Sequence, residues 1–146
     1  MKIAKTRDVK TPTRGTLQSA GLDFYIPDGW TMDNPIWPGQ SVCIPSGIKA
    51  NVPSGYALIA FNKSGVALKK GLDVGACVVD EDYQGEIHLH LTNVSREKIR
   101  LAAGEKIVQF VLLPVNYAEV EVVEEEHLFD EETERGSGGF GSTGVI

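Results

Sequence analysis

Short runs of apolar residues, each about as long as a single strand, recur along most of this chain. Continuous runs occupy 41–45, 56–61 and 107–113, whereas apolar and polar residues alternate over 87–92 and 118–123. The first pattern is typical of buried strands and the second of strands with one face in water. Turn-forming pairs that contain glycine or proline separate the runs. The pattern predicts an all-β domain built as a sandwich, a jelly roll or a barrel.

A single short helix is expected between two of these strands, at 64–70. Ser64 lies at its start, where a hydroxyl can accept a hydrogen bond from a free backbone N–H group. Gly71 follows the last residue, where many helices end in left-handed backbone. No internal repeat is visible, so we expect one β domain with one helix.

Composition and charge argue against several classes of function. The 146 residues and a hydrophobic content of 42% suit one domain with a buried core. No membrane-length apolar run or signal-peptide pattern is seen, which predicts a cytoplasmic protein that does not bind membranes. The net charge of −6 argues against nucleic-acid binding, so a polyanionic ligand needs a local positive cluster, a metal ion or both. Cys43 and Cys77 are expected to be free thiols.

The last part of the chain changes in composition. Residues 124–134 are rich in carboxylates and read as a solvated acidic tether, which reaches roughly 35 Å when extended, enough to meet a neighbouring subunit. Residues 135–146 are rich in glycine, and they include Arg135 for an anion and Phe140 for stacking on a base. The sequence thus predicts a β core at 1–123, a tether and a mobile flap that closes over a phosphorylated, ring-bearing ligand. A disordered glycine tail is the alternative.

The densest polar cluster between two predicted strands lies at 79–86. Asp80 follows two valines, so its carboxylate is expected at a strand end, partly desolvated, where it can orient and deprotonate a water molecule. Gln84 and Gly85 are expected to form the turn of a hairpin. The alternative is an acidic hairpin tip without a chemical role.

Three further candidates lie elsewhere in the chain. Residues 62–65 follow a strand and open the predicted helix, so their backbone N–H groups, hydroxyl and lysine suit a phosphate. Gln109 lies within an apolar strand and is either a satisfied core amide or a ligand-facing group. His88 and His90 share one face of a strand, where solvated side chains are expected more readily than a metal site.

Taken together and in order, these segments resemble the five motifs of the trimeric dUTP pyrophosphatase (dUTPase) family. The matching segments are 19–24, 63–65, 75–86, 104–109 and 135–144. They extend over nearly the whole chain, and the third and fifth are the most specific. The resemblance implies a jelly-roll fold with a flexible flap, and a homotrimer with shared active sites. It also implies Mg²⁺-dependent hydrolysis of dUTP to dUMP and pyrophosphate, which keeps uracil out of DNA and supplies dUMP for dTTP synthesis.

The resemblance implies roles for residues around the base and the reacting phosphorus. Asp80 matches the carboxylate that activates the water attacking the α-phosphorus. Tyr83 matches the aromatic side chain that packs on the deoxyribose and leaves no room for a 2′-hydroxyl. A tight hairpin backbone reads uracil and excludes the thymine methyl group. Its residues are Val74, Cys77, Val78 and Val79.

The resemblance also implies which residues hold the phosphates and the metal. The phosphate-binding set comes from the second, fourth and fifth motifs and comprises Lys63, Ser64, Gly65, Gln109, Arg135, Gly141, Ser142 and Thr143. Phe140 would stack on uracil. No side chain would ligate Mg²⁺ directly, because the phosphates hold it and Asp23 meets it at most through water.

Four positions depart from the family pattern. Lys63 and Lys106 stand where arginine is more usual, Asn62 where proline is, and Cys77 where glycine is common. Lysine keeps the charge of arginine but loses its bidentate fork. We expect these changes to alter phosphate affinity without abolishing turnover.

Three other functions remain as alternatives. A dCTP deaminase on the same fold needs a glutamate that moves protons at the base, and Glu86 is the candidate. A dUTP-binding sensor would bind without turnover. A purely structural trimer would leave the flap and its Arg135 unexplained.

Overall fold

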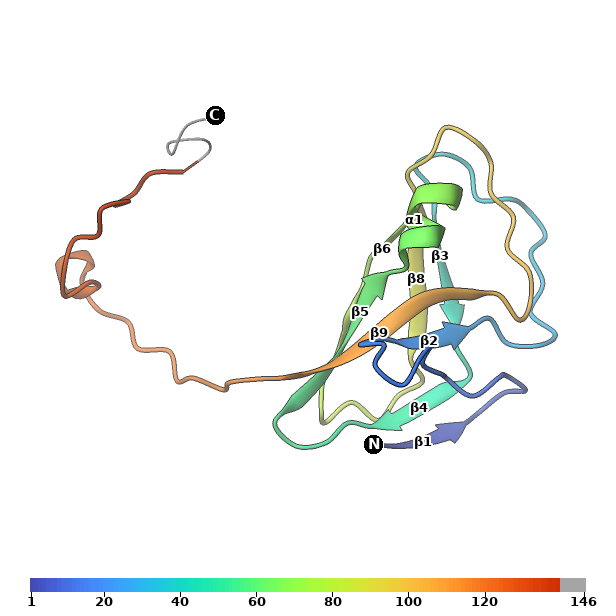
Figure 1. The fold of residues 1–146 in the computed structure, drawn as a ribbon, viewed down its shortest axis with the longest axis horizontal. Coiled ribbons are helices and arrows are strands. Elements are labelled where there is room, and N and C mark those ends of the chain that lie inside the picture. The colour runs from blue at the N-terminus through green and yellow to red at the C-terminus, as the bar shows by residue number, and fades with distance from the viewer. Residues whose placement is uncertain (140–146) are drawn as a thin grey trace. The chain divides into compact units, whose positions relative to one another are not determined.

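The computed structural model describes residues 1–139 and divides the chain into two compact units, Met1–Asn116 and Tyr117–Ile146. Every strand of the described residues belongs to the first unit (Figure 1). Within each sheet, neighbouring strands run antiparallel. The expected all-β class is confirmed, with α1 (Ser64–Lys70) as the one α-helix of the described chain.

The largest sheet has the strand order β2-β9-β5-β7. These strands span Leu22–Tyr25, Lys106–Pro114, Tyr56–Asn62 and Val78–Val79 respectively. β9 lies inside the sheet, where it pairs with β2 on one side and with the whole of β5 on the other. Because β5 runs almost directly into α1, this sheet also sets where the helix begins.

Two smaller sheets complete the first unit. One has the order β3-β8-β6, from Ser41–Pro45, His88–Asn93 and Leu72–Val74. The other is the pair β1-β4, from Lys2–Lys5 and Ile48–Asn51. β6 and β7 are neighbours in sequence but belong to different sheets, so the short connection between them crosses from one sheet to the other.

Side chains from the sheets form one hydrophobic core. The rings of Phe24 on β2 and Phe110 on β9 lie 4.5 Å apart, centroid to centroid. The predicted alternation over 87–92 is confirmed, because Leu89 and Leu91 on β8 are fully buried while His88 is exposed. Such burial removes apolar surface from water and fixes the register of the strands.

Four of the five predicted strands are confirmed, and the fifth is wrong. The alternating stretch 118–123 is irregular and lies in the second unit. Val120 and Val122 are 92% and 93% exposed. A strand needs a partner for its backbone groups, and within the described part of the second unit none is present. Alternation in the sequence was therefore insufficient to form a strand there.

The predicted helix is confirmed at both ends, but its capping differs from expectation. Lys63, with extended backbone, occupies the N-cap position and makes no side-chain capping bond. Ser64 is already the first helical residue, so it is not the cap. Gly71 adopts φ 65° and donates its N–H to the carbonyl of Ala67 at 3.0 Å, as the sequence predicts. Among the described residues, no helix has the length and apolar character needed to cross a membrane.

Candidate active site

The first group of predicted site residues gathers on a buried carboxylate. Asp23 on β2 is 5% exposed. Its Oδ1 contacts the ammonium of Lys63, and its Oδ2 lies 3.0 Å from Nζ of Lys106. Lys63 comes from the start of α1 and Lys106 from the start of β9, so three elements meet here. We call these three residues the Asp23 cluster.

Opposing effects act on the pKa of Asp23. Burial raises it, because a charged carboxylate loses hydration, but hydrogen bonds and attraction from Lys63 and Lys106 together outweigh burial. The pKa of Asp23 is therefore lowered, and the carboxylate is ionised at neutral pH. In return, Asp23 raises the pKa of Lys106. The cluster thus presents two lysines whose charges one carboxylate partly balances.

Gln109 lies beside this cluster. It stands opposite Asp23 across the β2–β9 ladder and donates from Nε2 to the backbone carbonyl of Asn62 at 2.8 Å. Gly21 packs directly beneath it, where any Cβ would collide with the amide. Gln109 is half-buried. Its amide donates a hydrogen bond, as expected of a satisfied core amide, and part of the side chain is accessible, as expected of a group that faces a ligand.

Ser64 and Gly65 form the exposed first turn of α1, next to Lys63. Apart from its chain neighbours and the backbone of the helix itself, no heavy atom lies within 4 Å of the position that a Cβ on Gly65 would take. Backbone N–H groups of a first helical turn have no partner within the helix. The predicted phosphate residues of the second and fourth motifs are therefore brought together on one surface.

The predicted base-reading residues lie on a second segment, 74–79, which we call the base segment. It was expected to be a hairpin, and this is wrong in the single chain. β6 pairs with β8 and β7 pairs with β5, so the two strands form no ladder with each other. The connection is nonetheless held, because Ala60 donates its N–H to the carbonyl of Cys77 at 2.7 Å.

Asp80 follows β7 directly, at the strand end that the sequence predicts. Its expected partial desolvation is wrong for the single chain, in which Asp80 is exposed. A strand of only two residues lies at the sheet edge and shields little of the loop after it. The carboxylate is thus open to water and to any ligand that approaches this loop.

Tyr83 folds back onto its own loop. Its hydroxyl donates to the carbonyl of Glu86 at 2.9 Å, and its ring lies against Gly85, where any Cβ would overlap the ring. The expected hairpin turn at Gln84 and Gly85 is not formed, since the loop joins strands of different sheets. The tyrosine is nevertheless held in one orientation with 43% of its surface exposed.

Glu86, the proton-moving candidate of a deaminase, is occupied elsewhere. Arg7 binds it with both Nε and Nη2, at 2.8 and 3.2 Å, and Gly47 donates its backbone N–H to it at 2.7 Å. The hydrogen bond from Arg7 is the main cause that lowers the pKa of Glu86. A carboxylate held ionised in this way is poorly suited to donate a proton, which weighs against the deaminase alternative.

Comparison with known proteins decides the family. A family model described as dUTPase matches residues 7–144. The chain belongs to the dUTPase family. A deoxyuridine 5′-triphosphate nucleotidohydrolase of Yarrowia lipolytica is 39% identical, over 99% of this chain and 89% of that protein. The mouse protein of the same name is 39% identical, over 91% of this chain and 77% of its own.

The fold agrees with solved dUTPase structures. The dUTPase of Staphylococcus bacteriophage 80alpha with dUPNHPP superimposes with a TM-score of 0.83 at 25% identity, covering 99% of this chain and 98% of that chain. The expected single-domain, jelly-roll-like dUTPase fold is thereby confirmed.

The fifth motif lies in the second unit. Arg135 is exposed and donates from Nε to the carbonyl of Gly138 at 3.0 Å, so it contacts its own turn. Four predicted site residues lie outside the described residues: Phe140, Gly141, Ser142 and Thr143. Their roles stay predictions.

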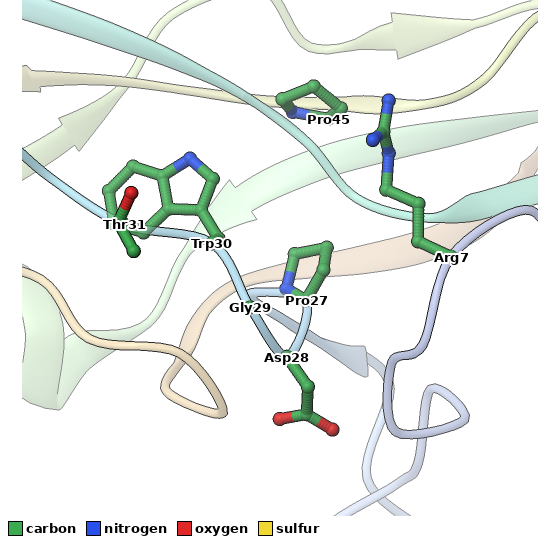
Figure 2. A pocket seen from close by; sticks show the side chains of 7 residues that line it. All are labelled: Arg7, Pro27, Asp28, Gly29, Trp30, Thr31 and Pro45. Atoms are coloured by element: carbon green, nitrogen blue, oxygen red, sulfur yellow. The ribbon is translucent and has the colours of Figure 1, made fainter.

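The dUTPase motifs do not coincide with the pocket shown in Figure 2. That pocket, of about 380 Å³, lies in the first unit among Arg7, Trp30 and Pro45. Figure 2 shows the carboxylate of Asp28 pointing away from the Arg7 guanidinium, which is already paired with Glu86. None of the residues that line this pocket belongs to the predicted site.

No metal centre is preformed among residues 1–139, where no three His, Cys, Asp or Glu side chains group as ligands. Sequence reasoning missed the contacts that two side chains make with the base segment: Asn62 and His90 each accept a hydrogen bond from it. Asn62 was noted only as a departure from the family, and alternation alone placed His90 in solvent. Neither sequence signal reveals that the side chain reaches a neighbouring segment.

Proposed function

We propose that this chain hydrolyses dUTP to dUMP and pyrophosphate, with water attacking the α-phosphorus. The observation that carries the proposal is the meeting of Lys63, Lys106 and Gln109 around Asp23, beside the open first turn of α1. This surface offers positive charge and amide donors in a chain of net charge −6. Relatives named deoxyuridine 5′-triphosphate nucleotidohydrolase support the choice of substrate.

The Asp23 cluster and the first turn of α1 would bind the phosphates. Lys63, Ser64 and Gly65 provide an ammonium, a hydroxyl and backbone N–H groups, and Gln109 provides an amide. Asp23 holds both lysines at one place before the ligand arrives, since each of its carboxylate oxygens contacts one ammonium group. A triphosphate would then compete with Asp23 for ammonium groups that are already in place.

Asp80 would orient and deprotonate the attacking water. Its exposed position directly after β7 leaves both carboxylate oxygens accessible. The rate gain would come chiefly from positioning the water in line with the leaving pyrophosphate.

The base segment would recognise uracil, and Tyr83 would recognise deoxyribose. Backbone groups of Val74, Cys77, Val78 and Val79 that are not bonded within the chain would hydrogen-bond one edge of the base. Tyr83 is braced by Glu86 and Gly85, so its ring offers a fixed surface to the sugar. A fixed ring excludes a 2′-hydroxyl better than a mobile one.

The site would be completed by other copies of the chain in a homotrimer. Among the described residues, no hydrogen bond or ion pair joins Asp80 or Tyr83 to the Asp23 cluster. In the described part of one chain, the loop that carries Asp80 and Tyr83 is thus not held to the Asp23 cluster by polar contacts. Arg135, Phe140, Gly141, Ser142 and Thr143 would close the assembled site over the phosphates and the base.

Magnesium would be held by the substrate. Because both oxygens of Asp23 bind lysines, and no ligand cluster is preformed among residues 1–139, the phosphates would supply most of its oxygen ligands, with water for the rest. When bound, it would neutralise phosphate charge. Asp23 would contact it at most through water.

Hydrolysis in water labelled with heavy oxygen tests the proposal. Attack at the α-phosphorus places the label in dUMP, whereas attack at the β-phosphorus places it in pyrophosphate. Asp80→Asn should keep nucleotide binding but lower kcat by about a hundredfold or more, the scale of losing a positioned base. Label in pyrophosphate, or near-normal turnover of this variant, would refute the mechanism.

A further inference from the structure

Three consecutive backbone N–H groups of the base segment are all bonded to two residues. The N–H of Val74 donates to Oδ1 of Asn62 at 2.9 Å, and that of Gly75 to the carbonyl of His90 at 3.0 Å. The N–H of Ala76 donates to Nδ1 of His90 at 2.8 Å. Two of the three acceptors are therefore side-chain atoms, which take the place of the carbonyl groups of a strand partner.

Asn62 is held in the orientation that this bond requires. Its Nδ2 donates to Oδ1 of Asp73, which fixes the amide so that Oδ1 faces Val74. Its carbonyl accepts the amide of Gln109 at 2.8 Å, and it directly precedes Lys63. One asparagine thus connects the phosphate-binding surface to the base segment.

His90 is fixed by its strand. The residues on either side of it on β8, Leu89 and Leu91, are fully buried, so the backbone there is anchored in the core. The imidazole lies against Gly75, where any Cβ would overlap the ring. Because Nδ1 accepts from Ala76, the ring carries its proton on Nε2 in this arrangement.

We propose that Asn62 and His90 are positioning residues that lock Val74–Ala76 and thereby set the discrimination between uracil and thymine. The inference rests on the proposed function. A pocket rejects an extra methyl group only if its wall does not move aside, and backbone held at three successive N–H groups is such a wall. Without these acceptors the segment can shift, so the methyl group is tolerated and uracil is held less well.

Two variants remove the acceptors, and two more restore them. Asn62→Ala and His90→Leu each delete one side-chain hydrogen bond to the base segment. His90→Asn restores an acceptor near the place of Nδ1. Asn62→Asp combined with Asp73→Asn exchanges amide and carboxylate, which keeps the acceptor for Val74 and a donor between the two side chains.

Two control variants lie outside the base segment and the proposed machinery. Asn34→Ala alters an asparagine in an exposed loop. Thr92→Val removes a side-chain hydrogen bond between β8 and Ser41 on β3, so it tests the effect of losing any such bond on β8. Both should match the wild type in every readout.

The first readout is amide hydrogen exchange at 74–76 in the ligand-free protein. One lost hydrogen bond should speed exchange there by about two- to tenfold. The second readout is steady-state hydrolysis of dUTP and dTTP. We expect KM for dUTP to rise and the dUTP-to-dTTP ratio of kcat/KM to fall, each by about two- to tenfold, with kcat for dUTP nearly unchanged.

The outcomes separate this inference from the proposed function. Faster exchange and lost discrimination in Asn62→Ala and His90→Leu, with recovery in the restoring variants, would support it. Unchanged discrimination in a wild-type-like dUTP hydrolase would overturn the inference alone, as would a fall in kcat without a change in discrimination. A wild-type chain inactive on dUTP would overturn the proposed function, and the inference with it.

Discussion

Lys106 and Asp23 form an ion pair between β9 and β2, with 3.0 Å from Nζ to Oδ2. Lys63, from the start of α1, contacts the other oxygen of the same carboxylate. Residues from three motifs that are far apart in the sequence thus meet at one buried group. This arrangement links the stability of the fold to the two lysine charges that we propose bind a phosphate.

Asp23→Asn should destabilise the protein by about 1–3 kcal/mol at neutral pH, because charged hydrogen bonds from two lysines are lost. The folded-state pKa of Asp23 lies below its unfolded value, so this stabilisation is present above about pH 4 and fades as the pH falls further. Urea unfolding at neutral and acid pH measures it. The difference in the free energy of unfolding between the wild type and Asp23→Asn should become smaller at acid pH.

The exposed loop variant Asp33→Asn is the control for that experiment, since Asp33 is exposed. It should leave stability unchanged at both pH values. If the difference in the free energy of unfolding between the wild type and Asp23→Asn stays constant with pH, Asp23 stabilises the fold through packing and not through its charge.

Gly85→Ala should loosen the steric selection of deoxyribose. The added methyl group would lie 2.9 Å from Cε2 of Tyr83 and closer still to its hydroxyl, so the ring must turn away. We expect UTP hydrolysis to rise relative to dUTP by about tenfold, the scale of a relaxed pocket contact. Competing rates with the two nucleotides measure this.

Two further variants accompany Gly85→Ala, one with the same expected effect and one as a control. Tyr83→Ala should raise UTP use in the same direction. Gly15→Ala, where a Cβ meets Ser19 Oγ at an ordinary 3.4 Å, should change nothing. An unaltered UTP-to-dUTP ratio in both Gly85→Ala and Tyr83→Ala would remove Tyr83 from the role of sugar gate.

The fold class could be predicted from the sequence because the burial of a side chain follows the local pattern of apolar and polar residues. The alternation around Leu89 and Leu91 and the glycine after α1 each act within a few residues, so they were predictable. The strand predicted at 118–123 does not form. Alternation of apolar and polar residues favours a strand, but a strand also requires a partner for its backbone hydrogen bonds. The predicted hairpin at the base segment failed for a related reason, since pairing of β6 with β8 is a long-range choice.

The candidate site shows the same division between local and long-range information. The order of motifs indicated Lys63, Gln109 and Asp80 before any contact was known. It did not show that Lys63 binds Asp23, because that depends on where α1 begins relative to β2. Nor did it show that His90 reaches Ala76, since a polar residue on a strand face normally points to water.

Removal of 135–146 should separate folding from activity. All described strands lie in Met1–Asn116, so far-ultraviolet circular dichroism and the thermal midpoint should stay close to those of the full chain. If the flap supplies charge stabilisation to the phosphates, kcat/KM for dUTP should fall by about a hundredfold or more. Removal of 145–146 alone is the control and should keep activity. A shortened chain that unfolds would show that the tail is structural.

Pyrophosphate release from dUTP, dCTP, dTTP and UTP, each with Mg²⁺ and again with EDTA, tests the central claim most directly. We predict release from dUTP far above the other three nucleotides, and its loss when EDTA removes the metal. Tight binding of dUTP without release would contradict the assignment as a hydrolase and favour a sensor. Conversion of dCTP to a deoxyuridine product would contradict it in favour of a deaminase, despite the binding of Glu86 by Arg7.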